Sequence, residues 1–178
     1  MRKIFKPQCY IILGIPVLFA VGTLFHFIYE LSGENFFVGL FAPVNESVFE
    51  HTKMVALPIF LWWGIYYLVN KQKLRPNAWF TAALISMVTA IVSIPLLYYF
   101  YTGAFGVHLL WADIAILFFA LLLGQLLGLH YYRHGKGINC TAAVLIMVFI
   151  LILFAFFTVI PPKLPIFQDS ITGAYGIK

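Results

Sequence analysis

Most side chains that could do chemistry lie in three short stretches of the sequence. The first holds His26 and Glu30, the second covers 45–51, and the third holds His108 and Asp113. The whole chain has only five histidines and six acidic residues, so the stretches contain most of both. Imidazoles and carboxylates can bind a metal, transfer protons or hold a polar ligand. We therefore expect a functional site where these stretches meet.

One hypothesis for this site is a metal centre. Its candidate ligands are His26, His51, His108, Asp113 and Glu30. Histidine nitrogens and carboxylate oxygens suit a divalent metal such as zinc, which could activate a water molecule for hydrolysis. The spacing matches no dedicated zinc motif, so whether a metal is the cofactor stays open.

Two other hypotheses need no metal. In the first, Ser47 is a nucleophile, His51 its base, and an acid such as Asp113 or Glu50 orients the base. Ser47 and Glu50 also have the spacing of a helix capping box, which would make both structural. In the second, the cluster binds or conducts a small cation, a proton or a lipid head group. The further binding candidates are Asn45, Glu46, Asp169 and Tyr175.

Apolar helices must position these residues. Apolar residues make up 63% of the 178-residue chain and charged residues 10%, against about 25% charged in soluble domains. This excludes a soluble enzyme and predicts an all-α, polytopic membrane bundle that forms a single domain over 1–178. The predicted spans are 9–29, 48–69, 78–101, 108–129 and 138–160, followed by an extracytoplasmic tail, 161–178.

The basic residues predict the orientation in the cell membrane. Eight of the eleven Lys and Arg lie before the first span, after the second or after the fourth. Basic loops stay cytoplasmic, so the N-terminus should be inside and the C-terminus outside. The basic residues Arg2 and Lys3 belong to the inner set, and Lys178 to the outer side. Attraction to the anionic inner leaflet explains the net positive charge without nucleic acid as a partner.

The predicted orientation collects the acids on the outer side. Asp113 would lie within a span, where a carboxyl group must be protonated, paired or wet, and we expect a histidine partner. Gly124 and Gly128 form a GxxxG pair for close helix packing, either within the chain or between chains. Whether the tail docks on the outer face or extends loosely, and whether the chain forms oligomers, stay open.

Three segments carry a resemblance to a known family. They are His26-Phe-Ile-Tyr-Glu30, Pro43-Val-Asn-Glu-Ser-Val-Phe-Glu-His51 and the stretch 165–176, Pro-Ile-Phe-Gln-Asp-Ser-Ile-Thr-Gly-Ala-Tyr-Gly. Together they resemble small, uncharacterised multi-spanning membrane proteins of Gram-positive bacteria. The resemblance implies a membrane location and no known activity.

A more distant likeness is to seven-helix intramembrane hydrolases of the alkaline ceramidase and progestin/adipoQ-receptor type. Those proteins bind zinc through three histidines with a serine and an aspartate nearby. Ser47, Asp113 and three histidines match by residue type, although the number of helices differs. The likeness implies an alternative function, metal-dependent hydrolysis of a lipid-like substrate. A structural or accessory membrane subunit is a further alternative.

Overall fold

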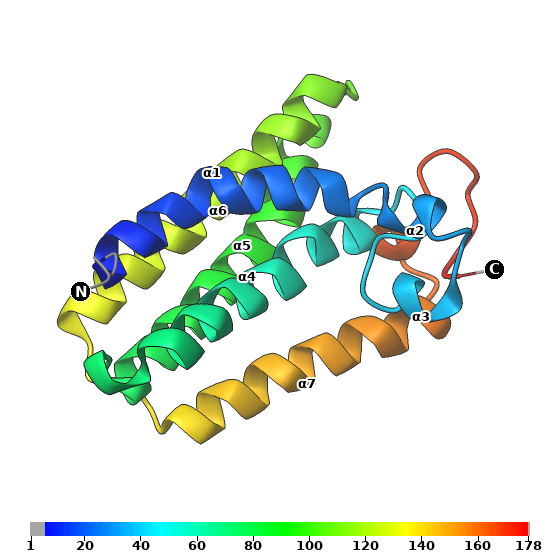
Figure 1. Ribbon diagram of the computed structural model, residues 1–178. Coiled ribbons are helices and arrows are strands. Elements are labelled where there is room, and N and C mark those ends of the chain that lie inside the picture. The colour runs from blue at the N-terminus through cyan, green and yellow to red at the C-terminus, as the bar shows by residue number, and fades with distance from the viewer. Residues whose placement is uncertain (1–5, 178) are drawn as a thin grey trace.

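A computed structural model describes residues 6–177 of the chain. The predicted inner residues Arg2 and Lys3, and Lys178 at the end of the predicted tail, lie outside the described residues. Within 6–177 the chain forms helices, turns and loops, with one isolated antiparallel bridge between Gln168 and Tyr175. Figure 1 shows long helices lying side by side.

Five helices are long and apolar enough to cross a membrane, the number that the sequence predicts. They are α1 (Pro7–Phe25), α4 (Val48–Asn70, continued by the 3-10 turn η1, Lys71–Lys73), α5 (Pro76–Phe105), α6 (Leu110–His134) and α7 (Cys140–Val159). The first helix is shorter than expected, because the chain turns at His26 and Phe27 before the short helix α2 (Ile28–Leu31). Helix α5 is longer, and it ends at Gly106 with a positive φ of 64°.

The helices pack around α5. Helix α6 packs along α5 as a hairpin, α1 lies against α6 and α4, and α7 lies against α5 and α4. The buried core includes Ile59, Trp63, Trp79, Met87 and Leu121. Large apolar side chains such as Phe100, Leu110 and Phe149 remain exposed on the outside. An apolar exterior around a packed interior is what a bundle surrounded by lipid requires.

The GxxxG pair packs within the chain, the first of the two alternatives. A Cβ added to Gly124 would lie 2.6 Å from the backbone oxygen of Ser86, and one added to Gly128 would lie 2.9 Å from that of Ala82. Both contacts are with α5. The glycines therefore set the close approach of α5 and α6.

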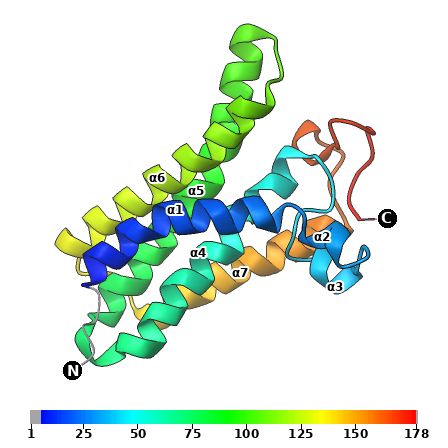
Figure 2. The same ribbon diagram turned by 45° about the horizontal axis from the view of Figure 1, so that its top comes forward.

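One end of the bundle, here called the tail end, carries the candidate residues. The C-terminus of α1, α2, α3 (Phe36–Gly39), the N-terminus of α4, the C-terminus of α7 and the turn η2 (Pro165–Phe167) meet there. The tip of the α5–α6 hairpin leans away from them (Figure 2). Pro95 lies in this part of α5, where it removes a helical hydrogen bond.

The tail docks on this end of the bundle. The Ile177 N–H donates to the Thr158 carbonyl at 3.0 Å, which ties the end of the chain to α7. The Phe167 ring lies 4.4 Å from the Phe49 ring of α4, measured between centroids. Of the two arrangements left open for the tail, the docked one is therefore found.

Candidate functional site

Two histidines and one glutamate converge at the tail end. The Nε2 atoms of His26 and His51 are 3.3 Å apart. His26 Nε2 lies 3.4 Å from one carboxylate oxygen of Glu46, and His51 Nε2 lies 3.3 Å from the other. Their side chains are 29%, 30% and 36% exposed for His26, His51 and Glu46, so the group is accessible. We call His26, Glu46 and His51 the His–Glu group.

Each member of the His–Glu group sits at a helix end or just beyond it. His26 is the residue at which α1 stops, and His51 lies in the first turns of α4. Ser47 caps α4, because its hydroxyl oxygen accepts the Glu50 N–H at 3.3 Å. Glu46 precedes this cap, so its side chain is free to reach across to α1.

Hydrogen bonds keep the Glu46 side chain of the His–Glu group ionised. Hydrogen bonds from His26 and His51 hold the pKa of the Glu46 carboxyl well below its usual range, despite its burial. The hydrogen bond with Glu46 also raises the pKa of the His26 imidazole, and this outweighs the opposite effect of burial. An ionised carboxylate between two imidazoles attracts a cation, either a metal ion or a proton.

The distances of the His–Glu group fit a tetrahedral metal site. Zinc binds nitrogen and oxygen at about 2.0–2.2 Å, so two ligand atoms of a tetrahedral site lie about 3.3–3.5 Å apart. The two Nε2 atoms, 3.3 Å apart, have this separation, and each lies 3.3–3.4 Å from a different oxygen of Glu46. One ligand atom from each of the three residues lies within 4.8 Å of the other two. Two histidines and one carboxylate are also a ligand set of catalytic zinc, in which the fourth position is open.

A buried ion pair lies in the same first turns of α4 as His51. Lys53 Nζ is 2.7 Å from Glu50 Oε2, and the two side chains are 1% and 2% exposed. The ammonium group also donates to the backbone oxygens of Gly39 and Ala42. Glu50 in turn accepts from the Val44 N–H and from the Thr158 hydroxyl.

All three donors of Lys53 and both oxygens of Glu50 therefore have partners, and the pair joins the loop before α4 to α7. Glu50, a catalytic candidate, has a structural environment here. The capping box is half formed: Ser47 caps the helix, while the Ser47 N–H donates to the Asn45 side chain instead of to Glu50.

The tail holds the backbone of Glu46. The Ser170 hydroxyl donates to the Glu46 carbonyl at 3.1 Å, and the Glu46 N–H donates to the Asp169 carboxylate at 3.4 Å. The Asp169 carboxylate also accepts the N–H groups of Ile171 and Thr172. Burial raises the pKa of this carboxyl group, but the hydrogen bonds outweigh burial and lower it. Asp169 thus shapes the tail that positions Glu46.

Two further candidates, His108 and Asp113, have partners on the α5–α6 hairpin. Asp113 accepts the Tyr101 hydroxyl at 2.8 Å, so its partner is a tyrosine and not the expected histidine. His108 Nδ1 lies 3.0 Å from the Tyr98 hydroxyl. The reason is local: the hairpin connects α5 directly to α6, so each residue meets the nearest turn of the neighbouring helix.

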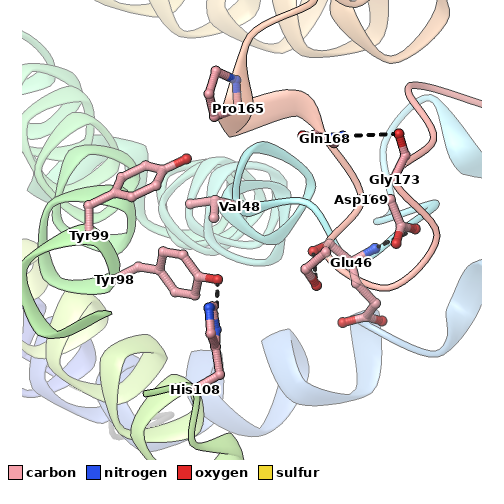
Figure 3. Close-up of a pocket in the computed structure, with 10 residues that line it drawn as sticks. Glu46, Val48, Tyr98, Tyr99, His108, Pro165, Gln168, Asp169 and Gly173 are labelled. Atoms are coloured by element: carbon pink, nitrogen blue, oxygen red, sulfur yellow. Dashed lines mark hydrogen bonds between the residues drawn. The ribbon is translucent and has the colours of Figure 1, made fainter. Parts of the chain in front are cut away.

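A cavity of about 360 Å³ separates the two sets of residues. Tyr98, Tyr99 and His108 line one wall, and Glu46, Asp169 and Gln168 line the other, as Figure 3 shows. Val48 and Pro165 also face it. Glu46 therefore belongs both to the His–Glu group and to the cavity.

The structure brings together some of the predicted site residues and separates others. His26 and His51 meet as expected for metal ligands, and their carboxylate is Glu46, which the sequence indicated only as a binding residue. Glu30, His108 and Asp113 lie outside the His–Glu group. Asn45 donates to the Gly176 carbonyl.

Sequence reasoning missed Lys53, Tyr98, Tyr99 and Gln168. The only available signal for Lys53 was its spacing from Glu50, because residues three apart share a helix face.

The comparisons with known proteins identify a family but no activity. The family described as "Family of unknown function (DUF6512)" matches residues 1–177. No curated protein and no solved structure matches the chain.

Proposed function

The chain belongs to the DUF6512 family, whose function is unknown, and we propose from its site that it is a multi-pass cell-membrane protein that binds a divalent metal ion. The metal, of which zinc is the natural example, would be held by His26, Glu46 and His51. The observation that carries this proposal is that one ligand atom from each of the three residues lies within 4.8 Å of the other two, with the two Nε2 atoms 3.3 Å apart. The position of the group at the end of the membrane helices makes it accessible from one side of the membrane.

Metal analysis of the purified protein tests the proposal. The full chain in detergent is incubated with Zn²⁺, freed of unbound metal and analysed by mass spectrometry of the elements. We expect about one zinc per chain, because the group offers one set of three ligands. His51→Ala should abolish this stoichiometric zinc, since two remaining ligands bind metal weakly.

The matched control is His130→Ala. His130 is an exposed histidine on α6 at the opposite end of the bundle, so its removal should leave the zinc content unchanged. Unfolding curves show whether each variant is folded. Wild-type protein without zinc, or zinc that survives in folded His51→Ala, contradicts the proposal. If both variants, His51→Ala and His130→Ala, are folded and have the zinc content of the wild type, a structural or accessory subunit is favoured.

A second candidate function is metal-dependent hydrolysis of a lipid-like ester. It is favoured by the open fourth ligand position and by the cavity that Glu46 shares with the His–Glu group. A bound metal would activate water to attack the ester carbonyl and release an acid and an alcohol. Zinc-dependent release of a fluorescent alcohol, lost in His51→Ala, would support it. Zinc-loaded protein without turnover on such esters would leave metal binding as the function.

A further inference from the structure

We propose that the cavity beside the His–Glu group binds a neutral, hydroxyl-rich head group, such as a sugar or glycerol. This inference goes beyond metal binding, because it concerns a separate space and mostly different residues. The volume of about 360 Å³ is at the lower end of the range of about 300–1,000 Å³ for small-molecule sites.

The carboxylates on the cavity walls already have hydrogen-bond partners. The Asp169 carboxylate accepts three backbone N–H groups, and the Glu46 carboxylate faces His26 and His51. None of the described residues that line the cavity is lysine or arginine. An anionic phosphate therefore finds no lysine or arginine, and an ammonium group finds both carboxylates already engaged by protein partners. A neutral ligand avoids the free-energy cost of placing an unpaired positive or negative charge in the cavity.

The cavity still has hydrogen-bonding capacity to offer. Among the described residues, the Tyr99 hydroxyl and the Nε2 atom of His108 have no hydrogen-bond partner. The Gln168 side chain uses its amino group on the Gly173 carbonyl, which leaves its own carbonyl oxygen available. A phenol, an imidazole nitrogen and an amide oxygen can each pair with a hydroxyl group.

The aromatic wall suits the apolar face of a polyol ring. The rings of Tyr98 and Tyr99 lie at 83° to one another with centroids 5.4 Å apart, so they form a corner. Aromatic rings give apolar contact area while their hydroxyl groups remain available for hydrogen bonds. Polar edges and an apolar face are the two features that a sugar presents.

The place of the cavity favours a lipid as the source of this head group. Close to Tyr99 on α5, Leu96 and Phe100 are 65% and 70% exposed, so exposed apolar surface lies on the same helix as one wall of the cavity. An alkyl chain could lie along this surface while the head group occupies the cavity. A free sugar would offer the same head-group chemistry without the chain.

A lipid-competition experiment tests the inference. The full chain is placed in nanodiscs with equal amounts of a neutral glycosyl diacylglycerol, anionic phosphatidylglycerol and ammonium-bearing phosphatidylethanolamine. Native mass spectrometry then identifies the lipids that stay bound. We expect the glycolipid to be enriched, and Tyr99→Phe to reduce this enrichment about fivefold, the value of one hydrogen bond of about 1 kcal/mol.

Tyr131→Phe, at the opposite end of α6, is the matched control and should keep the enrichment. If methyl glucoside displaces the glycolipid, and if it binds the protein in detergent as tightly as in nanodiscs, the site belongs to a free sugar. Equal retention of the three lipids, a preference for either charged lipid, or unchanged enrichment in folded Tyr99→Phe overturns the inference. The same measurement on wild-type protein freed of metal with a chelator separates it from metal binding, because the head-group preference should persist there without the metal.

Discussion

At the residue scale, the two groups of charged side chains at the tail end differ in their exposure to solvent. The Glu50–Lys53 pair is sealed from solvent and each of its polar atoms has a partner, whereas His26, Glu46 and His51 are about one third exposed. A sealed and saturated pair has nothing left to offer a ligand. An accessible group whose atoms point at one spot can accept a cation. We therefore assign structure to the first and binding to the second.

The buried pair makes a stability prediction. Lys53→Met leaves Glu50 charged and buried without its cation, which should lower the free energy of unfolding by about 3–5 kcal/mol. Thermal unfolding in detergent measures this. The control Lys163→Met changes an exposed lysine of the same tail end and should change stability little.

The double variant Glu50→Gln with Lys53→Met should recover part of the loss, because it removes the uncompensated charge. A Lys53→Met protein as stable as the wild type would show that the pair does not hold the loop before α4 to α7.

At the scale of the elements, the position of the cavity depends on how α5 and α6 pair. Small residues let the two helices touch at Gly124 and Gly128, while the hairpin tip leans away from the tail end. The wall with Tyr98 and His108 therefore stands apart from the wall with Glu46 and Asp169. The tight helix contact and the open tip together give the cavity its width.

Substitutions at two glycines test the contact between α5 and α6. Gly124→Ala would place a Cβ 2.6 Å from the Ser86 backbone oxygen, so α5 and α6 must separate and stability should fall by about 1–3 kcal/mol. Gly64→Ala is the matched control, since nothing lies within 4 Å of its added Cβ. That change should be neutral, or stabilise by up to about 1 kcal/mol through helix propensity. Equal melting temperatures of the two variants would contradict the packing argument.

At the scale of the whole molecule, charge is divided between the two ends of the bundle. The described acids lie at the tail end or in the neighbouring half of α6, and the loops at the opposite end contain the basic residues Lys71, Lys73, Arg75, Arg133 and Lys136. The start of α1 and the described end of the tail also lie at opposite ends of the bundle (Figure 1). This follows from an odd number of helices that are long enough to cross a membrane.

The orientation itself stays a prediction. Basic loops remain cytoplasmic, so a reporter active only in the cytoplasm should work when fused to the N-terminus or after Lys73. A reporter active only outside should work when fused at the C-terminus. The reverse pattern would place the His–Glu group on the cytoplasmic side, and it would leave the geometry of the group unchanged.

Much of the fold could be predicted from the sequence because its cause is local. A run of about 20 apolar residues in lipid must satisfy its own backbone, and a helix does this within the run. Four such runs, and a shorter fifth over 54–69 that needed extension upstream, predicted five helices. The spacing of Ser47 from Glu50 likewise identified the start of α4, since a cap depends on neighbouring residues.

Only the tertiary structure decided which residues the candidate side chains contact. The sequence brought His26 and His51 forward as candidates, but whether Glu30, Glu46 or Asp113 joined them depended on where α1 stops and how the loop before α4 runs. The pairing of Asp169 with the Glu46 backbone spans 123 positions of the chain. Local patterns carry no information about contacts between distant segments, because helix rotation and loop path arise from the packing of the whole bundle.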